Sequence, residues 1–284
     1  MKYRAVPIAL LTFFATLSIS ISDAEAVGPW TKSAGEFYVK TGTSYYRASA
    51  YREPSGALNE DAPYTSLTNY VFGQVGLWDN LHLQFYLPVE YARLEHQETE
   101  PGTSFGFGDT LVSLQASPLD LGIPTSIRLE AKLPIYEFDI SPPMAPNPGD
   151  HQVDYTLWLS AGGGMYSRGI PLYYFADIGY RYRTQTTFTS MLNQGQDFSD
   201  AFVSFAQVGY TVGETFDVGV GASALVPFRR EIIDESYVTV GPSIYWPVTD
   251  LVALEVDGYF TPYARNSGQG WAVGAGISFS RDSY

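Results

Sequence analysis

The stretch LHLQFYLPVEYARL, residues Leu81–Leu94, alternates apolar and polar side chains almost without interruption. Leu83 and Phe85 fall on one side of an extended chain, whereas His82 and Gln84 fall on the other. A two-residue period predicts a β-strand with one apolar and one polar face. The stretch is about twice as long as an ordinary globular strand. It is therefore long enough to cross a bilayer as a tilted strand.

Similar stretches recur along the chain and give about twelve predicted strands. They are Phe37–Ala48, Ser66–Leu77, Leu81–Leu94, Asp109–Ser117, Thr125–Tyr136, Asp154–Tyr166, Leu172–Arg183, Phe198–Val212, Phe216–Pro227, Tyr237–Trp246, Leu251–Thr261 and Trp271–Phe279. An even number of antiparallel strands brings both ends of the chain to the same edge of the sheet.

The links between these strands alternate in length. Short links lie at Trp78–Asn80, Ser167–Pro171, Gly213–Thr215 and Pro247–Asp250. Between them come longer polar links, among them EHQETEPGTSFGFG, TQTTFTSMLNQGQD and PYARNSGQG. This alternation predicts tight turns at one end of the structure and long loops at the other.

Four strands that lead into long links share a proline. Pro88, Pro134, Pro227 and Pro262 each follow an apolar residue or threonine, and a charge comes soon after. The spacing indicates an internal repeat of about 45 residues, with one hairpin per unit. Because proline cannot donate to a strand ladder, we expect each of these prolines to close the ladder at a strand end.

Two architectures could accommodate strands with one apolar and one polar face, and they differ in where the apolar face lies. Ile127 and Leu129 alternate with Arg128 and Glu130. A secreted sandwich or jelly roll would bury the apolar face, whereas a membrane barrel turns it outward to lipid and keeps a polar lumen. Strand length and the alternation of links favour an all-β, closed antiparallel transmembrane barrel of about twelve strands. Its short turns are expected in the periplasm and its long acidic loops outside.

The N-terminus has the features of a secretory leader. Lys2 and Arg4 precede an apolar run at Val6–Ile19, and small residues follow up to Ala26. This pattern predicts a signal peptide at residues 1–26 and a mature barrel at residues 27–284. About ten residues then precede the first strand, which is too few for a plug domain. We therefore expect any gate to come from the long loops.

The composition excludes several classes of function. The chain contains no cysteine, so disulfides, thiolate metal sites and cysteine nucleophiles are ruled out. Its net charge of -14 should repel nucleic acid. Aromatic residues make up 15% of the chain, which suits strands and interfacial girdles. The expected partners are outer-membrane lipid, a small-molecule solute and, during biogenesis, the barrel-assembly machinery.

The inward phase of the strands supplies the candidate lumen-lining residues. They are Lys40, Tyr86, Glu90, Arg128, Glu130, Lys132, Trp158, Asp177, Arg181, Arg183, Glu255 and Asp257. Charges of both signs predict either salt-bridge networks that fill the interior or a narrow polar passage with a slight acidic excess. The inward rings either line a track for aromatic solutes or fill space.

Catalytic, cofactor and metal sites are not expected. The chain has three histidines, His82, His96 and His151, and no GxSxG or HExxH motif. A run with His96 and two glutamates is typical of a solvated loop. The proline-rich segment Pro142–Asp150 reads as an exposed loop, or alternatively as a constriction that folds inward.

The middle of the chain resembles a known family. GFGDTLVSLQASPLDLG, IRLEAKLPIY and YYFADIGYRYR, within Phe105–Arg183, are similar to segments of the outer-membrane proteins grouped as the MetA-pathway phenol-degradation family. The resemblance implies a barrel that admits aromatic or other small hydrophobic metabolites. It carries no catalytic motif.

The sequence therefore predicts an outer-membrane channel of a Gram-negative bacterium for passive uptake of small, aromatic or hydrophobic solutes. The alternative is a structural or adhesive barrel with a filled lumen.

Overall fold

A computed structural model describes residues 28–60, 63–95, 100–118, 121–136, 146, 148–149, 152–167, 170–184, 198–213, 215–229 and 234–281. The expected signal peptide, His96, His151 and most of Pro142–Asp150 lie outside these residues.

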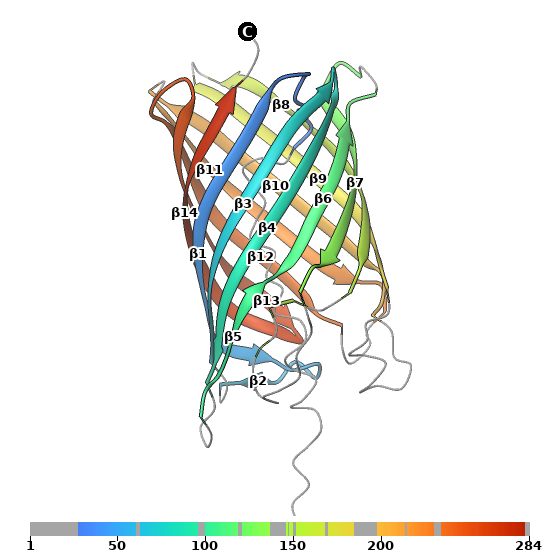
Figure 1. Cartoon of the computed structure of the whole chain (residues 1–284), viewed down its shortest axis with the longest axis vertical. Coiled ribbons are helices and arrows are strands. Elements are labelled where there is room, and N and C mark those ends of the chain that lie inside the picture. The colour runs from blue at the N-terminus through green and yellow to red at the C-terminus, as the bar shows by residue number, and fades with distance from the viewer. Residues whose placement is uncertain are drawn as a thin grey trace, which may run out of the picture.

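Every helix or strand of the described residues is a β-strand (Figure 1). The strands are β1 (Phe37–Arg52), β2 (Leu58–Asn59), β3 (Tyr64–Trp78), β4 (Leu81–Leu94), β5 (Gly102–Phe107), β6 (Asp109–Ala116), β7 (Thr125–Pro134), β8 (Asp154–Ser167), β9 (Ile170–Arg183), β10 (Ala201–Val212), β11 (Phe216–Pro227), β12 (Ser236–Pro247), β13 (Val252–Arg265) and β14 (Ser267–Arg281). No helix in this part of the chain is long and apolar enough to span a membrane.

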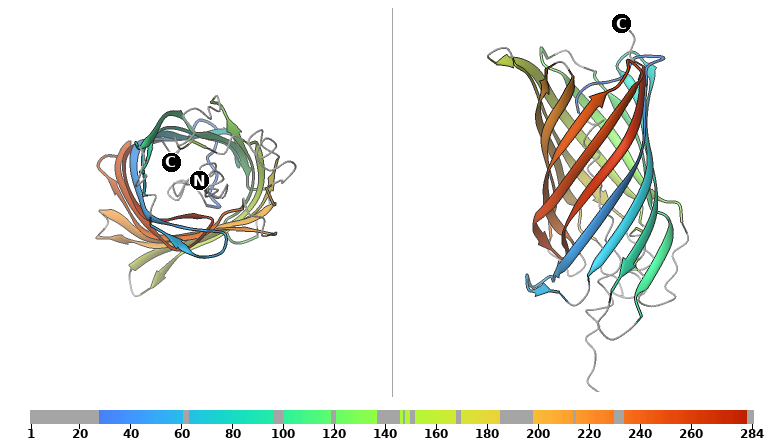
Figure 2. Two further views of the ribbon diagram at one scale, coloured as in Figure 1. Left: turned by 90° about the horizontal axis from the view of Figure 1, so that it is seen from below. Right: turned by 90° about the vertical axis from the view of Figure 1, so that its left-hand side faces the viewer.

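The sheet closes on itself, as the view along its axis shows (Figure 2). Each strand of the wall pairs antiparallel with its neighbours in chain order, and β1 pairs with β14 from Phe37 opposite Arg281 to Arg52 opposite Ser267. The β5 and β6 strands both pair with β4, and Gly108 alone separates them, so together they form one stave. With β2 outside the wall, twelve staves form the predicted closed barrel.

Turn lengths differ between the two ends of the barrel. The end that carries the β3–β4 turn is called the short-turn end, and the opposite end is called the long-loop end. Asn80 closes the β3–β4 turn with a φ of 63°, a left-handed conformation that asparagine tolerates better than most residues. Asn266 has a φ of 52° and is the single residue between β13 and β14. The expected long loop PYARNSGQG is therefore wrong, since both strands extend into it.

The expectation for the four prolines was correct for two of them. Pro134 and Pro227 end β7 and β11. Pro88 lies in the middle of β4, where the pairing passes from β6 to β5, and its carbonyl accepts a hydrogen bond from the amide of Gly108. Pro262 lies within β13, beside a register shift against β12. A bulge spares the ladder from needing the missing N–H, so proline is tolerated there.

The two faces of the wall are inverted relative to a soluble protein. On β7, Leu129 is 62% exposed, whereas its neighbour Arg128 is 4% exposed. The same alternation of exposed apolar and buried polar side chains runs along β4, β8 and β13. An apolar exterior around a polar interior requires lipid outside and a closed ladder of backbone hydrogen bonds. The barrel therefore spans a membrane, and its lumen is the candidate site.

Candidate functional site

The twelve residues predicted for the lumen lie on the inner phase of their strands. Ten are buried, and Tyr86 and Arg181 are half-buried. The buried ones are Lys40, Glu90, Arg128, Glu130, Lys132, Trp158, Asp177, Arg183, Glu255 and Asp257. They group into separate clusters.

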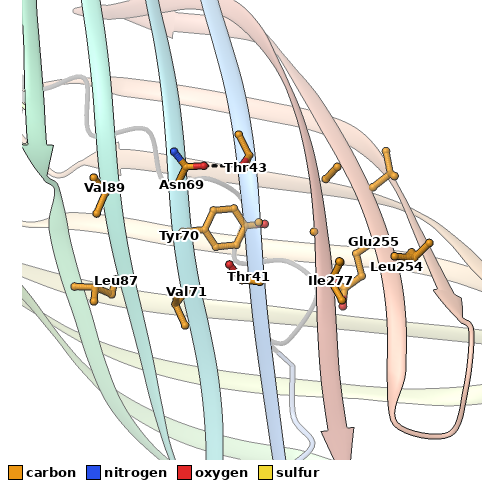
Figure 3. Close-up of a pocket in the computed structure, with 14 residues that line it drawn as sticks. Thr41, Thr43, Asn69, Tyr70, Val71, Leu87, Val89, Leu254, Glu255 and Ile277 are labelled. Carbon is orange, nitrogen blue, oxygen red and sulfur yellow. Dashed lines mark hydrogen bonds between the residues drawn. The ribbon is translucent and has the colours of Figure 1, made fainter.

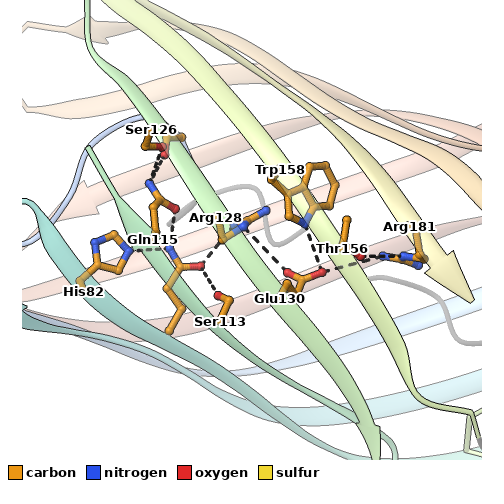
Figure 4. A network of polar contacts seen from close by, with 11 residues as sticks. His82, Ser113, Gln115, Ser126, Arg128, Glu130, Thr156, Trp158 and Arg181 are labelled. Atoms are coloured by element: carbon orange, nitrogen blue, oxygen red, sulfur yellow. Dashed lines mark hydrogen bonds and ion pairs between the residues drawn. The ribbon is translucent and has the colours of Figure 1, made fainter. Parts of the chain in front are cut away.

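The first cluster surrounds Glu130 on β7 (Figure 4). Its carboxylate accepts a hydrogen bond from the indole nitrogen of Trp158 at 3.3 Å. It also lies 3.9 Å from the guanidinium of Arg128 and 4.0 Å from that of Arg181. Arg128 packs over the ring of Trp158, 4.9 Å from its centroid. One carboxylate thus holds two guanidinium groups and a ring in a single arrangement across β7, β8 and β9.

Uncharged polar side chains continue this cluster across β4 and β6. Gln84 accepts hydrogen bonds from Arg128 and from Ser113, at 3.2 and 3.1 Å. Its amide nitrogen donates to Gln115 at 2.9 Å and lies 2.6 Å from His82. The sequence placed His82 and Gln84 on the inner face but did not single out Gln115. We call this inner surface, across β4, β6, β7, β8 and β9, the charged wall.

The segment Gly28–Glu36 lies against the charged wall at the short-turn end. Gln115 donates to the carbonyl of Gly28 at 2.7 Å, and the amide of Lys32 donates to Nδ1 of His82 at 3.0 Å. The backbone carbonyl of Glu36 accepts a hydrogen bond from the amide of Gly76 at 2.9 Å. These bonds attach the segment to several strands, so it is part of the folded barrel.

Close packing also holds this segment. The ring of Trp30 meets that of Phe175 edge to face, with centroids 5.7 Å apart. A methyl group on Gly76 would overlap the carbonyl oxygen of Ser33. The expectation that any gate must come from the long loops is therefore incomplete, because the chain before β1 occupies part of the lumen. This segment has no strand period, so the sequence pattern did not reveal its place.

A second cluster joins β1 to β13. The ammonium of Lys40 lies 2.9 Å from Glu255 and 3.8 Å from Asp257. The hydroxyl of Tyr38 donates to Glu255 at 2.6 Å, and Lys40 also lies 5.8 Å from the centroid of the Tyr70 ring. Lys40 therefore lies nearer to the carboxylate of Glu255 than to that of Asp257.

A third cluster lies toward the long-loop end. Lys132 lies 2.9 Å from Asp154 and 3.4 Å from Asp109. Arg183 lies 3.9 Å from Asp154 and covers the ring of Phe198. Here the charges of both signs pair with one another, as buried charges require.

Two predicted carboxylates lie outside these clusters. Glu90 accepts hydrogen bonds from Tyr64 at 2.8 Å and from Thr68 at 3.4 Å. Asp177 is fully buried opposite Ser160 on β8, and the charge of Arg128 acts on its carboxylate.

Aromatic rings on the inner face lean onto glycines of neighbouring strands. A methyl group on Gly209 would overlap the ring of Tyr173, its cross-strand partner. Tyr70 covers its own partner Gly42 in the same way. These rings lie along the wall rather than across the lumen. These glycines are not among the site residues predicted from the sequence. The occurrence of both glycine and aromatic residues at inward positions could have indicated that rings pack onto glycines.

The inner face of β10, β11 and β12 carries many small side chains beside Phe205, Gln207 and Tyr237, and we call it the small-residue wall. Its members are Gly209, Gly219, Gly221, Ser223, Thr239, Gly241 and Ser243. No ion pair is found between these strands within the described part of the chain. The two walls therefore differ in both charge and side-chain volume.

The outer surface has a recess of about 620 Å³ across β1, β3, β4, β13 and β14 (Figure 3). Thr43 and Asn69 lie beside it and share a hydrogen bond of 2.7 Å. Apolar side chains, including Val71, Leu87 and Ile277, complete its lining. Because the two polar groups satisfy each other, they are tolerated on the lipid face.

The described residues show no group of three or more His, Cys, Asp or Glu side chains that could hold a metal ion. His82 has its Nδ1 bonded to the Lys32 amide and its Nε2 beside Gln84, as described above.

No family model matches the chain, and no curated protein matches it. Solved structures do match. The COG4313 outer membrane channel from Pseudomonas putida F1 aligns with a TM-score of 0.66 at 13% identity, over 92% of this chain and 98% of that one. The translocator domain of the autotransporter NalP from Neisseria meningitidis aligns with a TM-score of 0.50 at 9% identity, over 90% of each chain. At these identities the likeness shows a shared barrel fold.

Proposed function

We propose that this protein is an outer-membrane channel of a Gram-negative bacterium through which small, mainly aromatic or apolar solutes diffuse passively into the periplasm. It reaches that membrane by way of the predicted signal peptide. The barrel fold that it shares with a structure named as an outer membrane channel supports a channel role.

The way the inner rings lie carries the proposal. Tyr70 and Tyr173 lean onto Gly42 and Gly209, and Phe205 packs against Gly221. A ring that lies along the wall leaves more of the lumen free than one that projects toward the axis. It also turns an apolar face toward a passing solute, which favours aromatic and apolar molecules.

The charged wall fixes the side of the lumen along which solutes pass. Its arginines and carboxylates hold one another, and the Gly28–Glu36 segment covers its short-turn end. The free path then runs beside the small-residue wall, where many side chains are short and none forms an ion pair among the described residues. Among the twelve predicted residues, Glu255 and Asp257 on β13 would border this path, and Tyr86 and the arginines would lie on its far side.

A second candidate is a structural or adhesive barrel with a filled lumen. The observation that favours it is the same segment, because Gly28–Glu36 is bonded to the wall at several points. In that case the segment would close the short-turn end and no solute would pass.

Uptake by proteoliposomes tests the proposal. Vesicles that contain the refolded mature protein are compared with empty vesicles for entry of benzoate, phenol and a sugar of similar size. The proposal predicts protein-dependent entry, faster for the aromatic solutes than for the sugar. Equal entry with and without protein would favour the filled barrel.

A further inference from the structure

A small cavity lies inside the small-residue wall. Its volume is about 20 Å³, and side chains from β10, β11, β12 and β13 line it. Gln207, Ser243, Asp257 and Tyr259 supply polar groups, and Phe205 supplies an aromatic ring. A cavity of this volume holds about one water-sized particle.

Several polar atoms around this cavity have no hydrogen-bond partner. They are Oε1 of Gln207, Oδ1 of Asp257 and the hydroxyl of Tyr259. Each belongs to a side chain that is 6–7% exposed. The amide nitrogen of Gln207 donates to Tyr173 at 3.0 Å and to Ser243 at 3.1 Å. Its amide oxygen makes neither of these bonds and is left as an acceptor without a donor. Buried acceptors without donors are costly, so the cavity favours a ligand that satisfies them.

The charges nearby set the sign of that ligand. The ammonium of Lys40 lies 2.9 Å from Glu255 but 3.8 Å from Asp257. Asp257 thus receives the longer of the two ion-pair contacts, and its Oδ1 accepts no hydrogen bond from the described residues. A buried carboxylate with so little compensation attracts a cation.

The ligand set selects among cations. One carboxylate oxygen, one amide oxygen and hydroxyls are hard oxygen ligands, and the rings of Phe205 and Tyr259 add attraction for a positive charge. Calcium takes about six to eight oxygen ligands and magnesium keeps several of its waters, and a cavity of about 20 Å³ has no room for them. Lys40 close by also opposes a double charge.

We propose that this cavity binds one monovalent cation of about the size of potassium, with Asp257 and Gln207 as ligands. If the protein is a channel, as proposed above, the cavity is a cation-binding step beside the solute path and makes the lumen prefer cations over chloride. The binding site itself does not depend on the channel role.

Thallous ion is the direct probe for the site, since it replaces potassium and scatters anomalously. Crystals of the mature protein are grown in a thallous salt, as wild type and as the variants Asp257→Asn and Asp217→Asn. Asp217 lies on the inner phase of β11 outside the cavity lining, so its variant matches the charge change. An anomalous peak between Asp257 and Gln207, lost in the first variant and kept in the second, is the expected result.

A water molecule at this position in wild type, with no anomalous signal, would overturn the proposal. If Asp257→Asn does not refold, Gln207→Leu removes the amide oxygen without changing charge and is expected to abolish the peak; an unchanged peak would also overturn the assignment.

Reversal potentials in a potassium chloride gradient separate the two proposals. Wild type is expected to prefer potassium over chloride, and Asp257→Asn should lower that preference several-fold more than Asp217→Asn. Equal effects of the two variants would contradict a cation step at this cavity. Absence of any conductance would contradict the channel while the thallium result still decides the site.

Discussion

The charged wall and the small-residue wall belong to one barrel and follow one sequence period, yet they are built differently. Across β4, β6, β7, β8 and β9 the inner side chains are long, and they bond to each other and to Gly28–Glu36. Across β10, β11 and β12 many of them are small, although Phe205, Gln207 and Tyr237 share this face, and rings lean onto the glycines. One half of the lumen is therefore filled by bonded side chains, and the proposed channel role assigns the solute path to the other half.

The largest expected effect comes from displacing the N-terminal segment from the charged wall. A valine at position 76, in Gly76→Val, would collide with the carbonyl of Ser33 and force Gly28–Glu36 away from β3. Conductance of the refolded barrel in planar bilayers should rise several-fold. Leu77→Val, at the adjacent outward position, should leave conductance unchanged. An unchanged conductance in Gly76→Val would show that the segment does not restrict the path.

Removing the carboxylate at the centre of the charged wall should change the conductance less than Gly76→Val does, but it should lower the free energy of unfolding substantially. Glu130→Gln leaves Arg128 and Arg181 without their shared carboxylate, and loss of one partner of a buried pair typically costs about 3–5 kcal/mol. Urea unfolding of the barrel in lipid measures this change. Glu95→Gln is the control, since its pair with Arg93 is exposed and should contribute about 0–1 kcal/mol. Similar losses in the two variants would contradict a stabilising network.

A smaller effect is expected on the small-residue wall. The added methyl group in Gly209→Ala would push the ring of Tyr173 toward the lumen, and the conductance should then fall slightly below that of the wild type. Gly163→Ala adds the same group on the outer phase of β8, against the hydroxyl end of Tyr174, and should have no effect. If both variants conduct like wild type, the rings do not border the path.

The smallest effect is expected at Asp177. Its carboxylate is buried opposite Ser160 on β8 and interacts electrostatically with Arg128. Asp177→Asn removes both the desolvation cost of the charge and its attraction to Arg128, and these two contributions largely offset each other, so the free energy of unfolding should change by less than about 1 kcal/mol. A large destabilisation in the same urea measurement would mean that the attraction to Arg128 outweighs the desolvation cost.

The sequence period was sufficient to predict which side chains face inward. Arg128, Glu130 and Lys132 alternate with apolar residues, and a period of two gives their direction without further information. The period does not report how far a side chain extends or onto which strand it leans. The contrast between the two walls therefore appears only when the register of neighbouring strands is known.

Where the sequence prediction and the structure differ, the causes are local. The sequence predicts a loop at Gly102–Phe107, because glycine and proline surround the segment, but the structure has β5 there. The sequence also predicts a strand end at Pro88, whereas a bulge at Gly108 allows this proline inside β4. The segment Gly28–Glu36 has no repeating pattern, since hydrogen bonds to His82 and Gln115 from distant strands fix its position.

Single-channel recording of the refolded mature protein in a planar bilayer tests the central claim most directly. If half of the lumen is open, the protein gives reproducible conductance steps, and added phenol or benzoate reduces the size of each step. A folded, heat-modifiable barrel that gives no steps, in wild type and in Gly76→Val alike, would contradict the account and favour a filled structural barrel.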